Sequence, residues 1–497
     1  MLDKTVTDWQ AIASNLDIEG RAFLNGSYVD ALSGETRQTL NPANGNTLTD
    51  VAVCGVEDAE VAVGFARSSF ESGAWSAMAP ADRKMVLVRW AELIDEHAEE
   101  LALLESLDVG KPISDTLHGD VPAASRTIRW SGEAIDKIYD EIAPTSGNSL
   151  ALVQRLPLGV VAAIVPWNFP LSTTAWKLAP SLATGNSVIL KPATNTPLTA
   201  IRIAGLASEA GLPDGVLQVL PGPGGSLGKH LSTHMDIDGL TFTGSTEIGK
   251  LLMEYSGQSN LKRTFLELGG KSPNIVFADG NLDKAAAYAA TAVFYNGGQT
   301  CTAGTRLIVE ESVQDEFIEK VIASAAKWMP GDPLNPKTRM GPMIDEWQYK
   351  TVADYVDIGK GEGAELLFGG GRVLDDTGGY YHEPSIFGGV NNQMRIAQEE
   401  IFGPVMSVLT FTDADEAVRI ANDSIYGLAG AVWSNNINTA HKVAAAVRVG
   451  TMGINNYFGG DITVPFGGFK QSGNGRDKSI HAFADYTELK TTWIEFE

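Results

Sequence analysis

Cysteine is scarce in this chain, which has only Cys54 and Cys301 among 497 residues. Two cysteines cannot form the disulfide framework of a small secreted domain, so a reducing compartment is expected. The N-terminus shows no basic segment followed by an apolar one, and a signal peptide is therefore not expected. These absences predict a cytoplasmic protein.

Long apolar runs and an excess of basic charge are also absent. The most apolar stretch, residues 156–171, contains three prolines and is too short to cross a bilayer. The 61 acidic residues outnumber the 37 basic ones, which gives a formal net charge of −24. Such a surface repels phosphates and anionic lipids, so we expect neither a nucleic acid nor a membrane as partner. A small local basic pocket for one phosphate remains compatible with this charge.

The chain is too long for one hydrophobic core, which predicts two or three domains. Residues 22–53 alternate polar and apolar side chains around two Asn-Gly pairs and predict small hairpins. Helical periodicity covers 56–107, where one helix is expected to start near Pro80 and to end near Gly110. A further helix is predicted at about 122–139, and 141–157 predicts a projecting hairpin.

From residue 160 onward, apolar strands alternate with helices. The strands carry continuous apolar runs, which are typical of strands buried on both faces of a parallel sheet. Five predicted strands precede Glu267, at 160–165, 187–190, 216–220, 239–243 and 263–266. The alternation restarts after Glu267, with strands at 274–277 and 306–310 and helices near 281–296 and 313–328. We therefore predict two α/β domains that meet near Glu267.

Cys301 follows a glycine turn, Asn296-Gly297-Gly298, and precedes an apolar strand-like run. A thiol at such a junction can reach a reactant, and the glycines let backbone N–H groups approach it closely. The alternative is a free cysteine that serves as a small core residue.

Glu267 lies between two leucines, thirty-four residues before Cys301. Apolar surroundings would raise the pKa of this carboxyl and make it suitable as a general base near neutral pH. Alternatively, the carboxylate caps a turn or pairs with Lys262 or Lys271.

Two glycine-containing turns follow predicted strands. The turn at 221–228 leads into a helix but lacks the spacing of the standard dinucleotide fingerprint, and an ordinary loop is the alternative. One strand later, Gly244 and Ser245 begin a helix. Free N–H groups and the helix dipole favour an anion such as a pyrophosphate at that point. Ser245 would also serve as an ordinary N-cap, which is compatible with anion binding.

Together these stretches resemble the aldehyde dehydrogenase superfamily, in residues and in separation. Motifs typical of that family occur in order along essentially the whole chain: Pro166–Pro170, Lys191-Pro192, Phe242–Thr246, Glu267–Gly270, Gln299–Cys301, Glu400–Pro404 and Pro465–Gly468. The resemblance implies a Rossmann-like dinucleotide-binding domain (1–139 and 158–266) and a second α/β, catalytic domain (267–467). A small β oligomerisation arm and tail (140–157 and 468–497) would pair across subunits, as a homodimer or a tetramer.

The resemblance also implies the oxidation of an aldehyde to a carboxylate. Cys301 would attack the aldehyde carbon, and the Asn168 amide with the Cys301 N–H would hold the oxyanion of the thiohemiacetal. Hydride transfer leaves a thioester, and Glu267 would activate the water that hydrolyses it. Lys177 would belong to a proton path, with a salt-bridged structural lysine as an equal alternative. No metal is required, and we find no cluster of His, Cys and carboxylates at ligand spacing.

NAD or NADP is the implied cofactor. Lys191 would meet the adenosine ribose, Gly244 and Ser245 the pyrophosphate, Glu400 the nicotinamide ribose, and Phe402 the nicotinamide. The other cofactor-binding residues implied by position are Val165, Trp167, Ala193, Thr194, Gly224, Gly228, Phe242 and Leu268. The family often has a glutamate where this chain has Thr194, and that glutamate would repel a 2′-phosphate. Thr194 can donate a hydrogen bond to one and Lys191 can neutralise it, so NADP should be accepted alongside NAD.

The substrate expectation comes from the same resemblance. The tail at 455–479 and the segment 133–139 are similar to bacterial dehydrogenases of γ-glutamyl-γ-aminobutyraldehyde and related ω-amino or guanidino aldehydes. Family position puts Asp120 and Asp461 near the entrance, where either could pair with a substrate cation; solvated surface acids are the alternative. The other implied substrate-binding residues are Phe169, Trp176, Thr300, Thr302 and Tyr457, and the aromatic ones are ordinary core residues if the tunnel lies elsewhere.

Three rivals are weighed at this point. A non-catalytic structural protein on the same scaffold is poorly supported, because Asn168, Glu267 and Cys301 are all present. Within the class, the chain could be a betaine-aldehyde or general aliphatic aldehyde dehydrogenase, which kinetics with charged and neutral aldehydes would separate. From another class, a cysteine hydrolase or acyltransferase would share the thioester step. That rival needs a histidine base at Cys301, and alkylation of the thiol unaffected by NAD(P) would favour it.

Overall fold

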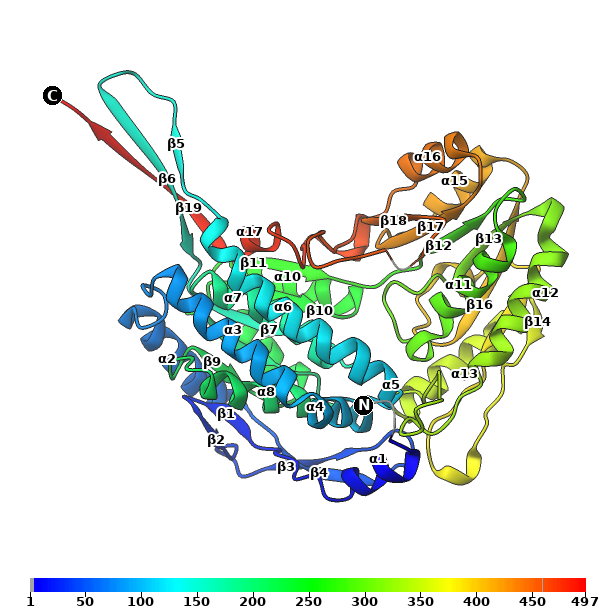
Figure 1. The fold of residues 1–497 in the computed structure, drawn as a ribbon, viewed down its shortest axis with the longest axis horizontal. Helices are drawn as coiled ribbons and strands as arrows, with labels where there is room; N and C mark the ends of the chain where they lie inside the picture. Colours follow the sequence, from blue (N-terminus) through cyan, green and yellow to red (C-terminus); the bar gives the residue numbers. More distant parts are fainter. Residues whose placement is uncertain (1–3, 458) are drawn as a thin grey trace.

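The computed structural model describes residues 4–457 and 459–497. Within these residues the strands form four sheets: two of seven strands, one of three and one of two. Figure 1 shows two large bodies side by side, with a strand arm projecting from the first. No helix in the described part of the chain is long and apolar enough to cross a membrane.

The first large sheet follows the predicted α/β pattern. Its strand order is β11 (Arg263–Glu267), β10 (Gly239–Thr243), β7 (Val160–Ile164), β8 (Ser187–Lys191), β9 (Leu217–Val219), β1 (Ala22–Leu24) and β2 (Ser27–Val29). The five strands from β11 to β9 are parallel, and β1 joins β9 antiparallel. Asn25 and Gly26, both with positive φ, close the predicted β1–β2 hairpin. The second predicted hairpin is the separate two-stranded sheet of β3 (Thr36–Leu40) and β4 (Thr47–Ala52).

Helices cover both faces of this sheet and bury its central strands β7, β8 and β9 almost completely. One face carries α3 (Pro80–Glu96), α4 (Ala98–Val109), α6 (Val121–Ala134), α7 (Pro170–Ala183) and α8 (Leu198–Glu209). The other face carries α2 (Val56–Ser72), α9 (Lys229–Thr233) and α10 (Thr246–Gln258). Short helices α1 (Val6–Ala13) and α5 (Ile113–Asp115) complete this half. The predicted parallel sheet with two helical layers is confirmed.

The single helix predicted to run on to Gly110 is in fact two helices. The buried stripe of Leu87, Trp90 and Ile94 belongs to α3 as expected, but α3 ends at Glu96, and its C-cap His97, with φ/ψ of −98°/23°, breaks the helix. α4 follows and is buried at every position from Leu101 to Val109. A helix segment buried on all sides has no polar stripe, so periodicity could not show the break. Gly110, with φ 83°, ends α4 as predicted.

The second large sheet is also mostly parallel. Its order is β14 (Glu365–Phe368), β15 (Ser385–Gly388), β16 (Val405–Phe411), β13 (Arg306–Glu310), β12 (Pro273–Val276), β17 (Ala429–Trp433) and β18 (Thr451–Ile454). Only the edge strand β14 pairs antiparallel with its neighbour. The helices of this half are α11 (Leu282–Phe294), α12 (Gln314–Ala325), α13 (Glu346–Gly361), α14 (Arg395–Gln398), α15 (Ala414–Asn422) and α16 (Ile437–Ala446).

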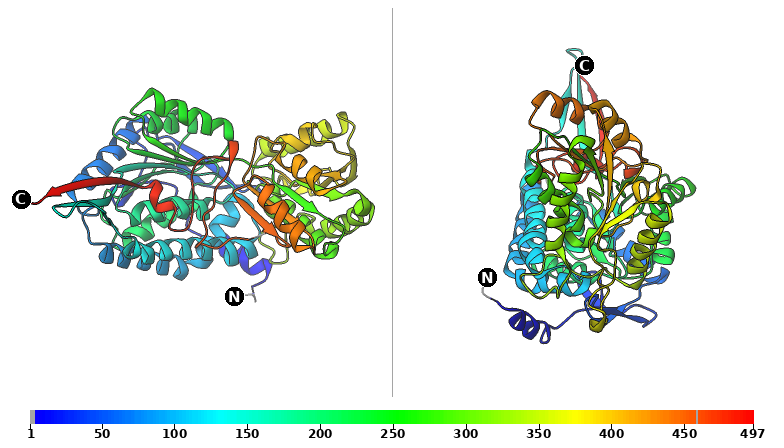
Figure 2. Two further views of the ribbon diagram at one scale, coloured as in Figure 1. Left: turned by 90° about the horizontal axis from the view of Figure 1, so that it is seen from above. Right: turned by 90° about the vertical axis from the view of Figure 1, so that its right-hand side faces the viewer.

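The arm is a three-stranded sheet in the order β19 (Thr487–Glu495), β6 (Ser149–Pro157) and β5 (Glu141–Ala143). β5 and β6 form the predicted projecting hairpin, and both views in Figure 2 show the arm extending away from the two bodies. β19 pairs with β6 of the same chain along its whole length, which leaves β19 as an outer edge.

The segment that leads to β19 crosses back between the two bodies (Figure 1). Its residues 472–475 bond to the backbone at the end of β11: the Leu268 N–H donates to the Ser472 carbonyl, and Gly473 forms a bridge with Glu267. Short helix α17 (Ala482–Asp485) then connects this segment to the arm.

Candidate functional site

Cys301 lies just after a tight turn that closes α11. Asn296, Gly297 and Gly298 all adopt left-handed φ values of 50°, 62° and 71°. A Cβ atom on Gly298 would lie 2.2 Å from the Gly403 carbonyl oxygen, so only glycine fits that position. This close backbone packing fixes the turn that precedes Cys301.

The Cys301 side chain is half-buried, and its burial raises the pKa of the thiol to about 12. The Glu400 and Glu267 carboxylates raise the pKa further, whereas the backbone N–H groups of Cys301 and Thr302 lower it. The thiol therefore stays protonated at neutral pH until a base removes its proton. Cys54, by contrast, is fully buried in an apolar cluster and fits the core-cysteine alternative.

Asn168 precedes α7 and interlocks with the cysteine turn. Its side-chain amide donates a 2.8 Å hydrogen bond to the Gln299 carbonyl, and the Asn296 amide donates a 3.0 Å bond to the Asn168 carbonyl. An amide NH₂ carries two hydrogens, and the bond to Gln299 uses one of them. The predicted oxyanion donor and the predicted nucleophile thus lie on two directly bonded segments.

Glu267 ends β11 with its side chain 2% exposed, and neither carboxylate oxygen has a hydrogen-bond partner among the described residues. Burial raises the pKa of this carboxyl well above its usual value, and the nearby Asp477 carboxylate adds to the shift. Lys262 donates instead to the Ser232 carbonyl, and Lys271 forms no ion pair with Glu267. The alternative of a lysine-paired Glu267 is therefore wrong.

Lys177 of α7 forms a buried ion pair with Asp477, with 2.6 Å between the Nζ atom and the carboxylate oxygen. This contact fits the alternative of a salt-bridged lysine, and a part in a proton path remains a prediction. Sequence reasoning missed Asp477, although it follows Arg476 in the tail motif and acts electrostatically on Glu267. A residue 300 positions from its partner gives no local signal of pairing.

The predicted cofactor residues gather at the carboxyl ends of β7, β8 and β10. Lys191 ends β8, is 3% exposed, and donates only to the neighbouring Pro192 carbonyl at 2.9 Å. Burial lowers the pKa of Lys191 to about 8. A buried cation without a carboxylate partner in the described chain fits a ribose hydroxyl or a phosphate of a ligand.

Gly244 and Ser245 lie at the start of α10 as predicted. The Ser245 hydroxyl accepts a 3.3 Å hydrogen bond from the Ile248 N–H and is the N-cap. A Cβ atom on Gly244 would lie 2.5 Å from the Phe242 ring, so a larger residue there would have to displace that ring. A Cβ on Gly224 would meet no atom within 4 Å, and one on Gly228 would lie 3.6 Å from the Lys191 side chain. This open glycine surface fits a dinucleotide.

Thr194 differs from the expectation. Its hydroxyl donates a 3.2 Å hydrogen bond to the Gly222 carbonyl and is therefore not a free donor for a 2′-phosphate. NADP is still favoured because Thr194 replaces the glutamate that would repel a 2′-phosphate, and because Lys191 nearby has no carboxylate partner in the described chain; Ala193 between them is half-buried.

Glu400 and Phe402 mark the other end of the predicted cofactor path. Glu400 accepts a 3.0 Å hydrogen bond from the Gly270 N–H, and burial raises the pKa of its carboxyl to about 7. Phe402 has a left-handed φ of 57° and meets the Trp167 ring edge-on at 5.2 Å. The remaining predicted positions, Val165 and Leu268, are buried directly after β7 and β11.

The predicted aldehyde-side residues are aromatic pairs around α7. Phe169 stacks on Tyr295 at 6.1 Å, and Trp176 packs against Phe466 at 5.1 Å. The Tyr457 hydroxyl donates a 2.6 Å hydrogen bond to the Thr302 carbonyl beside Cys301. The predicted residue Thr300 has a buried hydroxyl without a partner in the described chain.

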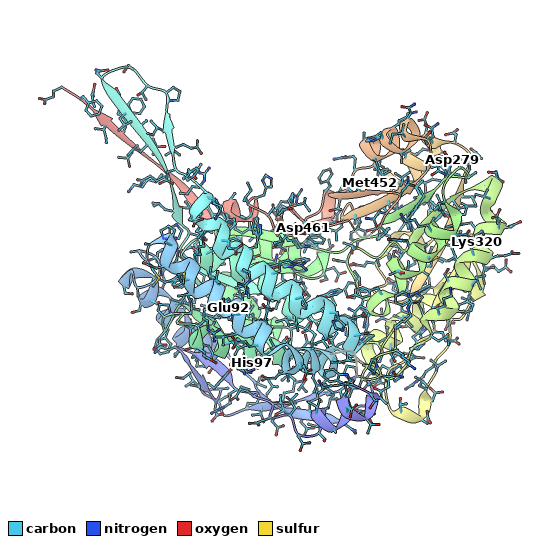
Figure 3. The ribbon with its side chains drawn as sticks, viewed as in Figure 1. Glu92, His97, Asp279, Lys320, Met452 and Asp461 are labelled. Atoms are coloured by element: carbon cyan, nitrogen blue, oxygen red, sulfur yellow. The ribbon has the colours of Figure 1, made fainter. Side chains whose placement is uncertain are left out.

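The two predicted entrance acids differ from each other. Asp120 is 3% exposed, pairs with Lys111 at 2.6 Å and accepts a 3.1 Å hydrogen bond from the Ser172 hydroxyl. It is therefore neither a solvated acid nor a free carboxylate, because the lysine occupies it. Asp461 is exposed, and hydrogen bonds from the Thr463 backbone and hydroxyl lower the pKa of its carboxyl. Figure 3 shows Asp461 on the segment that crosses between the two bodies.

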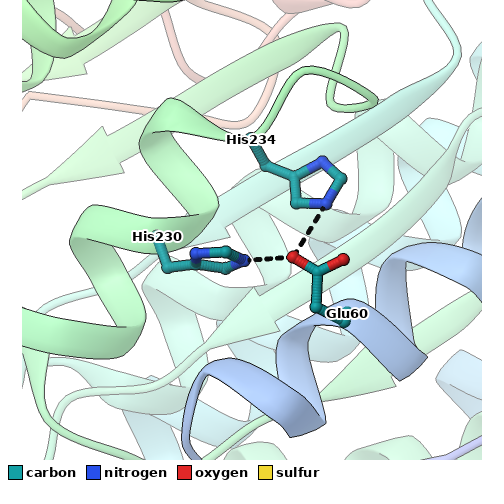
Figure 4. A group of neighbouring side chains, drawn as sticks. All are labelled: Glu60, His230 and His234. Carbon is teal, nitrogen blue, oxygen red and sulfur yellow. Dashed lines mark hydrogen bonds and ion pairs between the residues drawn. The ribbon is translucent and has the colours of Figure 1, made fainter.

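The structure brings together one cluster of residues of the kind that bind metal ions, which the sequence did not indicate because Glu60 is far in the chain from His230 and His234. Glu60 of α2 accepts from His230 at 2.7 Å and from His234 at 3.4 Å (Figure 4). However, the Asp236 N–H donates to Nδ1 of His234 at 3.0 Å, so neutral His234 carries its proton on Nε2, the atom that faces Glu60. A metal ion bound to Nε2 would displace the proton from that nitrogen and so break the contact of His234 with Glu60. The cluster therefore acts as a hydrogen-bonded clamp between α2 and α9.

Comparison with known proteins agrees with this geometry. A family model described as the aldehyde dehydrogenase family matches residues 28–492. The NADP/NAD-dependent aldehyde dehydrogenase PuuC of Escherichia coli is 51% identical over 98% of both chains. Two solved structures, each with a TM-score of 0.98, cover 99% of this chain and 100% of their own. They are a γ-glutamyl-γ-aminobutyraldehyde dehydrogenase of Burkholderia cenocepacia (54% identity) and the indole-3-acetaldehyde dehydrogenase AldA of P. syringae with NAD⁺ and IAA (58%). The chain therefore belongs to the aldehyde dehydrogenase family.

Proposed function

We propose that this aldehyde dehydrogenase oxidises an ω-amino aldehyde, carrying a γ-glutamylamino or guanidino group, to the carboxylate with NAD or NADP. The observation that carries the reaction is the unpaired, buried Glu267 carboxyl near the Cys301 thiol, both where the two α/β bodies meet. The substrate class is supported by relatives named for such aldehydes, which include an aminoacetaldehyde dehydrogenase of Pseudomonas aeruginosa at 45% identity.

The first step needs a thiolate at Cys301. Because the thiol has a raised pKa, a neighbouring base must take its proton, and Glu267 is the unpaired carboxyl whose charge acts on it. The raised pKa of Glu267 makes its ionised form a stronger base than an ordinary carboxylate. Cys301 then attacks the aldehyde carbon and forms a thiohemiacetal.

Two donors face the oxyanion of that intermediate in the proposed mechanism. They are the second hydrogen of the Asn168 amide and the Cys301 backbone N–H. Loss of one such donor typically costs about a hundredfold or more in rate. The bond from Asn168 to the Gln299 carbonyl fixes the amide before the substrate arrives, so the donor needs no reorganisation.

Water must then cleave the thioester, and Glu267 would take a proton from that water. Lys177 and Asp477 sit behind Glu267 as a buried pair, and we propose that they exchange its proton with solvent. The nicotinamide, when bound, supplies the hydride acceptor. In this proposal Lys191, Gly244 and Ser245 hold the adenosine and pyrophosphate end, and Glu400 with Phe402 holds the nicotinamide end.

The domain roles follow from these positions. We assign cofactor binding to 1–139 and 158–266, catalysis to 267–467, and subunit pairing to 140–157 and 468–497. The arm supports the last role because its edge strand β19 and neighbouring residues expose large apolar side chains, including Tyr139, Ile142, Leu489, Trp493 and Phe496. A homodimer or a pair of dimers in the cytoplasm is the proposed state.

The rival cysteine hydrolase finds little support. The strongest charges acting on the Cys301 thiol come from Glu400 and Glu267, and neither is the histidine that such an enzyme requires. Within the family, a neutral aldehyde is the competing substrate, because AldA at 58% identity is named for indole-3-acetaldehyde.

The deciding experiment measures NADH and NADPH formation from γ-glutamyl-γ-aminobutyraldehyde, 4-aminobutyraldehyde, indole-3-acetaldehyde and propanal, with Cys301→Ala as control. Rapid turnover of an amino aldehyde that disappears in the variant supports both reaction and substrate class. Cys301-dependent turnover of the neutral aldehydes alone would keep the reaction and overturn the amino-aldehyde assignment. No reduced cofactor from any aldehyde would contradict the reaction itself.

A further inference from the structure

Lys478 lies on the aldehyde side of the site, directly after the ion-paired Asp477. Its ammonium lies 4.3 Å from the centre of the Trp176 ring and 5.5 Å from that of Phe466. Trp176 and Phe466 pack against each other, so the lysine covers an aromatic pair. These rings hold the side chain in place through cation–π contact.

The backbone at Lys478 is in a conformation that needs a reason. Lys478 and Ser479 both have left-handed φ values, of 62° and 52°. Two successive non-glycine residues in this region are strained, and such strain is concentrated at functional sites. The strain is held by a bridge between Phe466 and Asp477 and by a 2.8 Å bond from the Ser479 N–H to the Ile462 carbonyl. The fold thus aims Lys478 at the aromatic pair.

The ammonium of Lys478 forms no ion pair within 4 Å in the described chain, although the protein carries a net charge of −24. Burial lowers the pKa of Lys478, whereas the adjacent Asp477 carboxylate, which is already ion-paired with Lys177, raises it; Asp461, Arg126 and the Cys301 thiol also act on it electrostatically. Arg126 is an exposed residue of α6 that likewise forms no ion pair among the described residues. Two unpaired cations therefore accompany one exposed carboxylate, Asp461, on the side where the aldehyde is proposed to enter.

We infer that Lys478, assisted by Arg126, forms an anion subsite on the aldehyde side and binds the carboxylate of the γ-glutamyl head group of the substrate. The inference rests on the proposed function and narrows its substrate class. A γ-glutamyl head carries one carboxylate and one ammonium, whose charges are opposite to those of Lys478 and Asp461 respectively. An unacylated amino or guanidino aldehyde carries only a cation, which the two basic side chains repel.

The test compares purified full-length enzyme with Lys478→Met, which keeps the alkyl stem over Trp176 and removes the charge, and with Lys478→Arg. For γ-glutamyl-γ-aminobutyraldehyde, kcat/KM should fall about tenfold in Lys478→Met, mainly through KM, because a partly desolvated charge pair is lost. For the same substrate, kcat/KM of Lys478→Arg should return close to the wild-type value, because the arginine restores the positive charge. For 4-aminobutyraldehyde, kcat/KM should rise, and for propanal it should stay within about twofold because the chemistry is untouched. Arg126→Met should shift the same two substrates in the same directions by a smaller factor.

An equal loss for all three aldehydes would overturn the inference, since it would mean that Lys478 only supports the packing of Trp176. Unchanged kinetics would overturn it as well. If the wild-type enzyme oxidises neither amino aldehyde, the proposed substrate class fails while the anion subsite can still be judged. Glutarate semialdehyde is then the probe: Lys478-dependent oxidation of this anionic aldehyde supports the subsite, and Lys478-independent oxidation or none contradicts it.

Discussion

Two buried groups of charged side chains lie along α7, and they differ in how completely their charges are paired. The Lys111 cluster consists of Glu105, Lys111 and Asp120, and it contacts the first turn of α7. The Glu267 cluster consists of Glu267, Lys177 and Asp477, and it contacts the middle of the helix. Both are almost fully buried.

Every carboxylate of the Lys111 cluster has partners. Asp120 bonds Lys111 and Ser172, whereas Glu105 accepts from the Thr199 hydroxyl at 3.0 Å and from the Leu171 N–H. In the Glu267 cluster, Asp477 and Lys177 satisfy each other and Glu267 is left without a partner. Complete pairing fixes the start of a helix, whereas one unpaired carboxyl keeps a proton acceptor available. In the proposed mechanism, this difference separates a structural use of buried charge from a chemical one.

The largest expected effect comes from removing the unpaired carboxyl. Glu267→Gln should lower kcat about a thousandfold, because a general base contributes on the order of 10²–10⁴-fold. The unfolding temperature should stay the same or rise, since no hydrogen bond or ion pair is lost. Steady-state kinetics and thermal unfolding measure both. Glu105→Gln is the matched control, which should lower the unfolding temperature and leave kcat within about tenfold of wild type; the reverse pattern would refute the comparison.

The second effect concerns the paired cluster. Lys111→Met leaves Asp120 and Glu105 buried without their cation, which typically costs about 3–5 kcal/mol of unfolding free energy. We expect a markedly lower unfolding temperature and retained kcat in the folded fraction. A variant as stable as the wild type but inactive would place Lys111 in the chemistry instead.

A smaller effect is expected in the pH dependence of stability. Because the folded pKa of Glu267 is raised, the folded state keeps a proton that the unfolded state releases above its ordinary pKa of 4.5. Its contribution to stability is therefore present below that value and is lost as the pH rises toward the folded pKa, at up to about 1.4 kcal/mol per pH unit. Between pH 5 and 8, Glu267→Gln should lose less thermal stability than the wild type. Parallel curves for the two proteins would contradict the raised pKa.

The smallest effect tests a single contact of the paired cluster. Thr199→Val removes the hydroxyl that donates to Glu105 and should cost about 1 kcal/mol, the usual net value of one buried hydrogen bond or slightly more. The kinetic constants should not change. A loss of activity at unchanged stability would show that the Lys111 cluster tunes the reaction.

Much of the fold could be predicted from the sequence, because its signals are local. Parallel strands such as β7 are continuous apolar runs, and the Asn25-Gly26 turn closes a hairpin by its own conformational preference. The fold class and the aldehyde dehydrogenase assignment are both confirmed. The break at His97 was missed because a helix buried on all sides has no periodicity to read.

The site was less predictable, because its details depend on contacts between distant residues. From the sequence, Asp120 is expected at the entrance, either as the partner of a substrate cation or as a solvated acid, and only the fold brings Lys111 and Ser172 to it. The hydroxyl of Thr194 is occupied by a carbonyl from the next strand-end loop, 28 residues away. Asp477 and Lys478 lie 300 or more residues from the α7 side chains that they contact. Composition and spacing cannot show such pairings.

The segment at 472–475, which bonds to the end of β11, sets an order of assembly. Ser472 donates to the Gly269 carbonyl across a separation of 203 residues, and β19 closes the arm by pairing with β6. During synthesis, the glutamate end of β11 leaves the ribosome long before the segment 472–475 that bridges it. The first sheet can form while translation continues, but the surroundings of Glu267 are completed only after that bridge has been made. A nascent chain should therefore acquire the fold of its first sheet before it completes the surroundings of the base that we propose.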